Sequence, residues 1–166
     1  MKQKGLQMRF TALPNLQVLD LAESFYSAAE ILKDNRSNAI PIINLRCHAI
    51  ELYLKALHLK DTATDFGDGV ALLRPTSGRG AGHQLGNSFT NALPEHQKEL
   101  LSGMPRLNEE LALLEGIFRR SRYIYENGDS LPFSTAEHVA RYLACRIPQL
   151  TPIPVRIDQI ASEDRK

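Results

Sequence analysis

The sequence predicts an all-α fold, an antiparallel four- or five-helix bundle with one long glycine-rich loop. Apolar residues recur at three- and four-residue spacing in several long segments, which is the pattern of amphipathic helices. Strand-like alternation of convincing length is missing, and glycines punctuate residues 61–82, where the helical pattern stops. The periodic segments together therefore predict a helical bundle.

Length and composition indicate one globular domain. A chain of 166 residues is long enough for one hydrophobic core, so we predict a single domain over residues 1–166, with its core at 15–147 and a proline-rich C-terminal tail at 148–166. The hydrophobic fraction of 43% and charged fraction of 23% argue against a largely disordered chain. Because the net charge is only +1, an anionic partner would have to meet a local patch.

The cysteines and the apolar runs bear on the compartment. Cys47 and Cys145 form neither a CxxC pair nor a disulfide-dense framework, which favours a reducing compartment. The basic N-terminus lacks the apolar core of a signal peptide, and no apolar run approaches the roughly 20 residues that span a bilayer. We expect a cytoplasmic protein that makes no membrane contact.

Two helices are predicted on either side of a polar turn at residues 35–38. The first begins at Asn15 and ends near Asp34, with an amphipathic pattern throughout. The second runs to about residue 60, and Pro41 is tolerated because it falls in the first turn. Apolar residues surround most of the second helix, so we expect it to be central and buried.

A long loop and two short helices follow. The periodicity fails over residues 61–82, which are rich in glycine and polar residues and predict a loop. Helical patterns return at residues 85–93 and 95–102, where Pro94 separates the two pieces.

The last third of the chain predicts two more helices and a tail. A long helix opens at Pro105 and continues to about Asn127. Ser134 and Glu137 have capping-box spacing, so the final helix should begin there and stop at residue 148. Prolines make the following tail extended at first, and residues 155–166 are either a short helix or a frayed terminus.

A first polar seam crosses the otherwise apolar second helix. Its residues are spaced 4, 3, 4 and 3 and share an arc of about 80°; they are Asn44, His48, Glu51, Lys55 and His58. Ionisable groups on a buried helix are costly without partners, so this first seam must meet water, a subunit, a ligand or countercharges. The alternative is a solvated face with a Glu51–Lys55 pair that contributes about 0.2–0.5 kcal/mol.

A second seam repeats the 4, 3, 4 spacing on the predicted long helix; it comprises Glu115, Arg119, Arg122 and Glu126. Arg119, Arg120 and Arg122 are forked donors suited to phosphate or carboxylate. Tyr123 and Tyr125 stand beside them, so this segment could hold RNA through phosphate contacts and base stacking. The alternative is a salt-bridged helix face.

Three short pieces resemble the HEPN family in their order and spacing. They are HAIELYLKALHL at residues 48–59, GHQL at 82–85 and RRSRYIYEN at 119–127, and the resemblance extends over about residues 15–147. It implies an antiparallel four- or five-helix bundle that is often a homodimer. It further implies association with RNA or a nucleotide, in a toxin–antitoxin or defence system.

Active members of this family resemble metal-independent ribonucleases, in which an Arg is followed four to six residues later by a His on the penultimate helix. Those residues meet across a dimer interface. The matching Arg is Arg122, or Arg120 at the longer spacing, and Asn127 stands in place of the His. An amide can position a phosphate but cannot exchange a proton. His83 and His48 are the nearest alternatives, although each also suits a structural role, His83 in a local cap and His48 in a polar network.

We therefore assign no catalytic residue. The candidates for RNA or nucleotide binding are Arg119, Arg122, Tyr123, Glu126, Asn127, His48, Glu51, Lys55 and His83. We expect no metal and no cofactor, because the histidines and cysteines lack ligand spacing and the glycine-rich stretch lacks a P-loop ending. Competing hypotheses are a noncatalytic module for dimerisation or for a nucleotidyltransferase-type partner, a ribonuclease with a non-standard site, and a small-molecule pocket under the loop.

Overall fold

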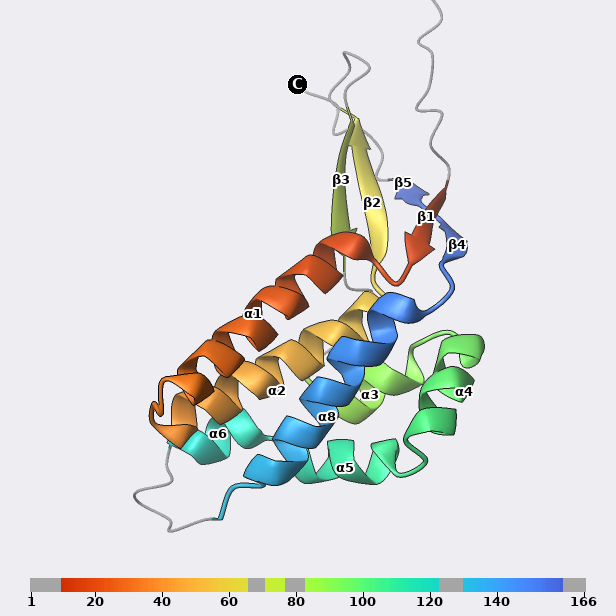
Figure 1. Ribbon diagram of the computed structural model, residues 1–166. Coiled ribbons are helices and arrows are strands. Elements are labelled where there is room, and N and C mark those ends of the chain that lie inside the picture. Colours follow the sequence, from red (N-terminus) through yellow and green to blue (C-terminus); the bar gives the residue numbers. More distant parts are fainter. Residues whose placement is uncertain (1–9, 66–70, 77–82, 123–129, 160–166) are drawn as a thin grey trace, which may run out of the picture.

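The computed structural model describes residues 10–65, 71–76, 83–122 and 130–159 (Figure 1). Within these ranges the protein is mostly helical, with two small sheets gathered at one end of the helices. The prediction of a predominantly helical protein is confirmed. The prediction of an all-α fold is wrong, because residues in three separate parts of the chain pair as strands.

The helices α1 (Leu16–Asp34) and α2 (Ala39–Ala56) form the central pair. Asn15 starts α1, because its side-chain oxygen accepts hydrogen bonds from the backbone N–H groups of Gln17 and Val18. This confirms the predicted start of the first helix. The second helix ends at Ala56 rather than near residue 60, because the chain there turns into a strand.

The predicted loop contains a hairpin of two antiparallel strands, β2 (Lys60–Asp65) and β3 (Ala71–Thr76). Their sequences, KDTATD and ALLRPT, lack the alternation of a half-buried strand, so periodicity missed them. On its other edge β2 pairs in parallel with β5 (Asp158–Gln159). β2 is therefore supported by backbone pairing with residues almost one hundred positions away in the sequence.

A second sheet joins β1 (Phe10–Leu13) to β4 (Ile153–Arg156) in antiparallel register. The buried carboxylate of Asp61 ties this sheet to the helices, since it accepts hydrogen bonds from Thr11 Oγ1 at 2.6 Å and Asn15 Nδ2 at 2.8 Å. The tail is thus part of the fold as far as residue 159, and the expectation of a helix or a frayed end is wrong for residues 155–159.

The short helices α3 (Leu85–Thr90) and α4 (Pro94–Gly103) are confirmed. The predicted long helix is instead two helices, α5 (Leu107–Leu114) and α6 (Ile117–Arg122). The break lies at Glu115, which is extended, and at Gly116, whose φ of 70° is readily adopted only by glycine. A spacing counted across this break does not define one helix face.

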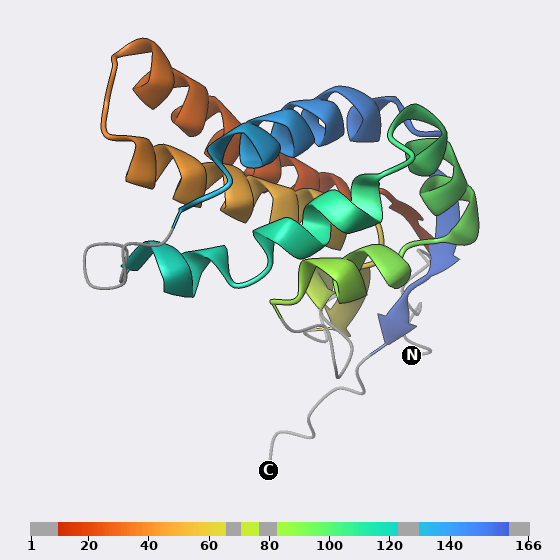
Figure 2. The same cartoon turned by 90° about the horizontal axis from the view of Figure 1, so that it is seen from below.

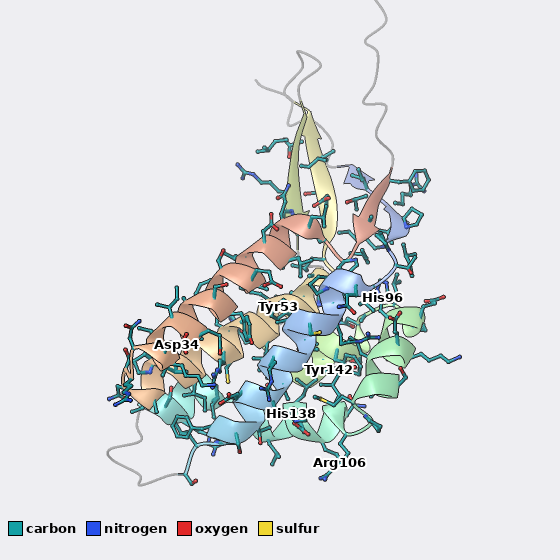
Figure 3. All side chains as sticks on the ribbon, viewed as in Figure 1. Asp34, Tyr53, His96, Arg106, His138 and Tyr142 are labelled. Carbon is teal, nitrogen blue, oxygen red and sulfur yellow. The ribbon has the colours of Figure 1, made fainter. Side chains whose placement is uncertain are left out.

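The last long helix is α8 (Phe133–Arg146), and a 3₁₀ turn at Ile147–Gln149 follows it. The predicted capping box is wrong, because Ser134 lies inside the helix and the Glu137 carboxylate binds Lys33 and Arg46. Figure 3 shows Tyr142 directed from α8 toward α4, where its hydroxyl donates to the Leu100 carbonyl at 2.5 Å.

The hydrophobic core lies around α2, as predicted for the second helix. α8 packs on it, α3 and α6 also contact it, and Figure 2 shows α6 and α5 following one another across the view beside α2. Fully buried side chains include Ile50, Tyr53, Leu54, Leu107, Leu111 and Leu143. Among the described residues, none of the helices is both long and apolar enough to cross a membrane.

Candidate functional site

The first seam is centred on a buried carboxylate. Glu51, on α2, is only 2% exposed, yet its Oε1 atom accepts hydrogen bonds from two cationic or titratable side chains. Lys55 Nζ lies 2.6 Å from Oε1, one helical turn along α2. His83 Nδ1 lies 2.9 Å from the same oxygen and comes from the segment that leads into α3. The structure therefore brings together three of the predicted site residues.

Glu51 is held as a carboxylate by its partners. Burial alone would raise its pKa, but hydrogen bonds and positive charge from Lys55 and His83 outweigh burial and hold the pKa below its ordinary value. The seam is therefore neither a row of solvated side chains nor an isolated helical ion pair. It is centred on a buried carboxylate that accepts a hydrogen bond from a residue 32 positions away in the sequence.

His83 has an unusual combination of order and exposure. Its side chain is 88% exposed, although one ring nitrogen is held by the buried Glu51. An ionised carboxylate can only accept hydrogen bonds, so Nδ1 of His83 carries the proton in this pair. In the neutral ring Nε2 is then the unprotonated nitrogen, which can accept a proton or a hydrogen bond.

His48 lies on the same helix face, one turn before Glu51. Its ring meets Phe25 of α1 edge to face, with ring centroids 4.3 Å apart. Burial lowers the pKa of His48, and the positive charge of Lys55 acts in the same direction, whereas the Glu51 carboxylate opposes it. His48 is therefore predominantly neutral at pH 7 and packs against the end of the seam as an aromatic side chain.

His58, the last residue of the first seam, does not join the cluster. It follows the end of α2, and its Nε2 atom is buried with no hydrogen-bond partner among the described residues. Burial and the neighbouring Lys55 lower the pKa of His58, so its ring is neutral. The first seam therefore does not continue from Lys55 to His58 as one helix face, although the spacing is regular.

Asn44, at the other end of the first seam, joins α2 to α6. The buried hydroxyl of Ser121 donates to Asn44 Oδ1 at 2.7 Å. This bond fixes α6, the helix that contains Arg119 and Arg122, against the N-terminal half of α2. Ser121 was not among the predicted site residues, and its position between two arginines was the available signal.

Glu115 does not belong to the second seam as predicted. Glu115 ends α5, and both of its carboxylate oxygens accept from the backbone N–H of Leu85, at 3.3 and 3.1 Å, so that this carboxylate caps α3. Arg120 donates to the Ser130 carbonyl at 3.0 Å, a structural contact. The side chains of Arg119 and Arg122 lie outside the described part of the structure, as do Tyr123, Glu126 and Asn127.

Sequence reasoning also missed a second charged cluster on α2, which we call the Arg46 network: Glu30, Lys33, Arg46 and Glu137. Arg46 is 4% exposed and donates to Glu30 of α1 at 2.8 Å and to Glu137 of α8 at 3.1 Å. At 100° per residue Arg46 lies about 200° from Asn44, so it faces away from the first seam. An arginine within an apolar helix was the signal, because such a charge needs partners.

The structure offers no metal centre in its described part, where no group of three or more His, Cys, Asp or Glu residues could hold an ion. Cys47 is buried, and burial raises the pKa of its thiol to about 12, which makes it a poor nucleophile. Among its described residues, the first seam presents hydrogen-bond donors and acceptors and, at His83, an exposed imidazole.

Comparison of the chain with protein-family models, with curated proteins and with solved structures found no match. The interpretation of the site therefore rests on its geometry and on the three short sequence pieces.

Proposed function

We propose that this protein is a HEPN-like module that binds RNA or a nucleotide over the surface where α2, α6 and the start of α3 meet. The observation that carries the proposal is the convergence of the three sequence pieces at α2. Glu51 contacts His83 at 2.9 Å, and Asn44 contacts Ser121 at 2.7 Å. His83 and Ser121, which are 32 and 77 positions from their partners Glu51 and Asn44, therefore both contact the same face of α2.

The charges around this surface support an anionic ligand. Lys55 is neutralised by Glu51, and Arg120 is engaged by the Ser130 carbonyl. Arg119 and Arg122 belong to the same helix, α6, and arginine suits phosphate groups because its guanidinium presents paired N–H donors. His83 adds an exposed imidazole, which Glu51 holds on the same face of α2 as Asn44. Such a mixture of guanidinium and imidazole groups suits phosphate and base contacts rather than an apolar ligand.

Fluorescence anisotropy of a labelled single-stranded RNA of about 12 nucleotides tests this proposal. The protein should bind it with an affinity that falls as salt rises, and the Arg119→Ala, Arg122→Ala variant should bind more weakly. Each lost phosphate contact should reduce the slope of log affinity against log salt by about 0.7.

A matched control removes two positive charges elsewhere. Arg106 precedes α5 and Arg156 ends β4, and both are exposed. The Arg106→Ala, Arg156→Ala variant should keep the wild-type salt slope, whereas equal losses in the two variants would indicate only non-specific attraction. Wild-type protein that fails to bind RNA or mononucleotides would overturn the proposal.

A noncatalytic interaction module is the second candidate, because Asn127 replaces the family's proton-transferring His. In this alternative the same surface forms a homodimer or holds a nucleotidyltransferase-type partner. Light scattering coupled to size exclusion, together with a pull-down, distinguishes it. A monomer that retains no protein would exclude this function.

A further inference from the structure

The outer edge of β3 is unpaired within the described residues. In the three-stranded sheet β3 lies at one edge, β2 in the middle and β5 at the other edge. β3 pairs with β2 along its whole length, and no described strand pairs with its other side. Every side chain of β3 that the structure describes is exposed or half-buried, and Figure 1 shows β2 and β3 projecting from the helices near the start of α1. Such an edge presents backbone N–H and C=O groups that can pair with another strand.

Two observations indicate which backbone groups of β3 point outward. Thr62 Oγ1 donates to the Arg74 carbonyl at 3.2 Å, so this carbonyl faces β2. Successive residues of a strand direct their polar groups to opposite sides, so Ala71, Leu73 and Pro75 direct theirs away from β2. Proline has no N–H, and in this phase Pro75 removes no hydrogen bond to β2. The outer edge therefore offers the N–H groups of Ala71 and Leu73 and the carbonyls of all three residues.

The exposed face of the hairpin is positively charged beside this edge. Paired residues of two strands lie on the same face, and the register places Lys60 and Arg74 on one face. Both side chains are exposed, and neither forms an ion pair with a described residue. Asp61 lies on the opposite face, and Asp158 belongs to β5, at the far edge of the sheet. Lys60 and Arg74 are therefore available to a carboxylate that lies along β3.

We propose that the outer edge of β3 binds an extended acidic segment of a partner protein, which adds an antiparallel strand to the sheet. Backbone hydrogen bonds with Ala71 and Leu73 hold the segment, and its side chains alternate between the two faces. Carboxylates lie beside Arg74 on the exposed face, and apolar side chains lie beside Leu73 and Pro75 on the other. This site is separate from the proposed RNA surface, because β2 follows the C-terminal end of α2 whereas α6 contacts its N-terminal half through Asn44.

The same features disfavour a second copy of this chain and RNA as the occupant. Antiparallel pairing of β3 with itself about Leu73 sets Pro75 opposite Ala71 of the other copy, where the missing N–H costs a hydrogen bond on each side. It also brings two positively charged faces together without a carboxylate. Phosphates of RNA suit Lys60 and Arg74 but leave the backbone groups of the edge unused. An acidic peptide strand uses both.

Amide hydrogen exchange followed by NMR tests the proposal. The probe is an acetylated and amidated peptide of about eight residues that alternates valine and glutamate. In the free protein β2 should protect the amides of Leu72 and Arg74, whereas those of Ala71 and Leu73 should exchange quickly. With the peptide at about ten times its Kd, exchange at Ala71 and Leu73 should slow about 10-fold. Unchanged exchange at about 5 mM peptide would overturn the proposal.

Two methylated probes test the backbone pairing while the protein stays unchanged. In an antiparallel strand whose glutamates lie beside Arg74, the valines lie opposite Ala71 and Leu73 and direct their N–H groups toward β3. N-methylation of the valines should therefore abolish the protection, and N-methylation of the glutamates should leave it in place. Any other pattern contradicts the antiparallel pairing.

Charge reversal tests the preference for an acidic segment. Arg74→Glu should weaken binding of the glutamate peptide about fivefold or more and should allow a peptide of alternating valine and lysine to bind. Arg141→Glu, at an exposed position of α8, is the matched control and should leave the affinity unchanged. Equal affinities of wild type and Arg74→Glu would remove the acidic specificity.

Two outcomes would identify a different occupant. Protection of Ala71 and Leu73 that rises with protein concentration in the absence of peptide would indicate a second copy of the chain. Displacement of the peptide by the labelled single-stranded RNA would indicate a nucleic-acid surface. Either result overturns the proposal for β3, and the RNA-binding test of Arg119 and Arg122 is decided separately.

Discussion

α2 carries two charged clusters on nearly opposite faces, the Arg46 network and the Glu51 cluster (Glu51, Lys55 and His83). In the Arg46 network the buried residue is a cation, and its carboxylate partners come from the flanking helices α1 and α8. In the Glu51 cluster the buried residue is an anion, and one partner comes from the segment before α3 with an almost fully exposed ring. The first cluster joins helices, whereas the second presents a side chain to solvent.

The two clusters differ in how firmly the partners of the buried charge are held in the fold. The guanidinium of Arg46 donates hydrogen bonds to two carboxylates on long helices, so it stabilises the interface between those helices and α2. Glu51 receives two donors on one oxygen, and only one of them belongs to a long helix. Disrupting the first cluster should therefore cost more stability than disrupting the second.

The largest effect is expected from Arg46→Met, which leaves Glu30 and Glu137 without their shared cation. The free energy of unfolding should fall by about 2–3 kcal/mol, less than the roughly 3–5 kcal/mol of fully buried pairs. The reason is that the two carboxylates are 34% and 33% exposed and can turn toward water. Urea denaturation measures the loss. Arg141→Met, at an exposed position of α8, is the control and should change stability by less than about 0.5 kcal/mol.

An intermediate effect is expected from Glu51→Gln, because a neutral amide loses two charge-assisted hydrogen bonds. At pH 7 the loss should be about 1–2 kcal/mol. The pKa of Glu51 is lowered in the folded protein from an ordinary value of 4.5, so its contribution is present above that value and is lost as pH falls through the lower, folded pKa. Wild-type stability should therefore decline below about pH 5, and Glu51→Gln should decline less steeply.

Urea denaturation at a series of pH values measures this slope. Glu109→Gln is the matched control, because Glu109 pairs with Arg106 on the surface with a side chain that is 64% exposed. It should leave both the stability and its acid dependence near those of wild type. Equal acid slopes in wild type and Glu51→Gln would show that the buried pair does not contribute as described.

The smallest effect on stability is expected from His83→Ala. A side chain that is 88% exposed buries little surface, so the free energy of unfolding should change by no more than about 0.5 kcal/mol. Thermal and urea unfolding measure it. A loss comparable to that of Arg46→Met would make His83 a structural residue and would remove the contrast between the two clusters.

Local signals in the sequence predicted the helices well. Asn15 starts α1 through its own side chain, Pro94 opens α4, and the apolar circumference of α2 marks a central helix. Each depends on capping, backbone restriction or periodicity over a few residues. Local rules failed where one residue altered the direction of the chain, as at Gly116, which divides the predicted long helix and removes Glu115 from the second seam.

The sequence by itself therefore determined where most helices begin and end and that Asn44, His48, Glu51 and Lys55 share one face of α2. Tertiary structure alone decided that residues 60–76 pair as strands, because their hydrogen-bonding partners include residues far along the chain. It also decided that Glu51 is buried with His83, while Arg46 on the other side of α2 is enclosed by α1 and α8. Helical spacing identifies residues that share a face, but burial and partners depend on which distant segments pack against it.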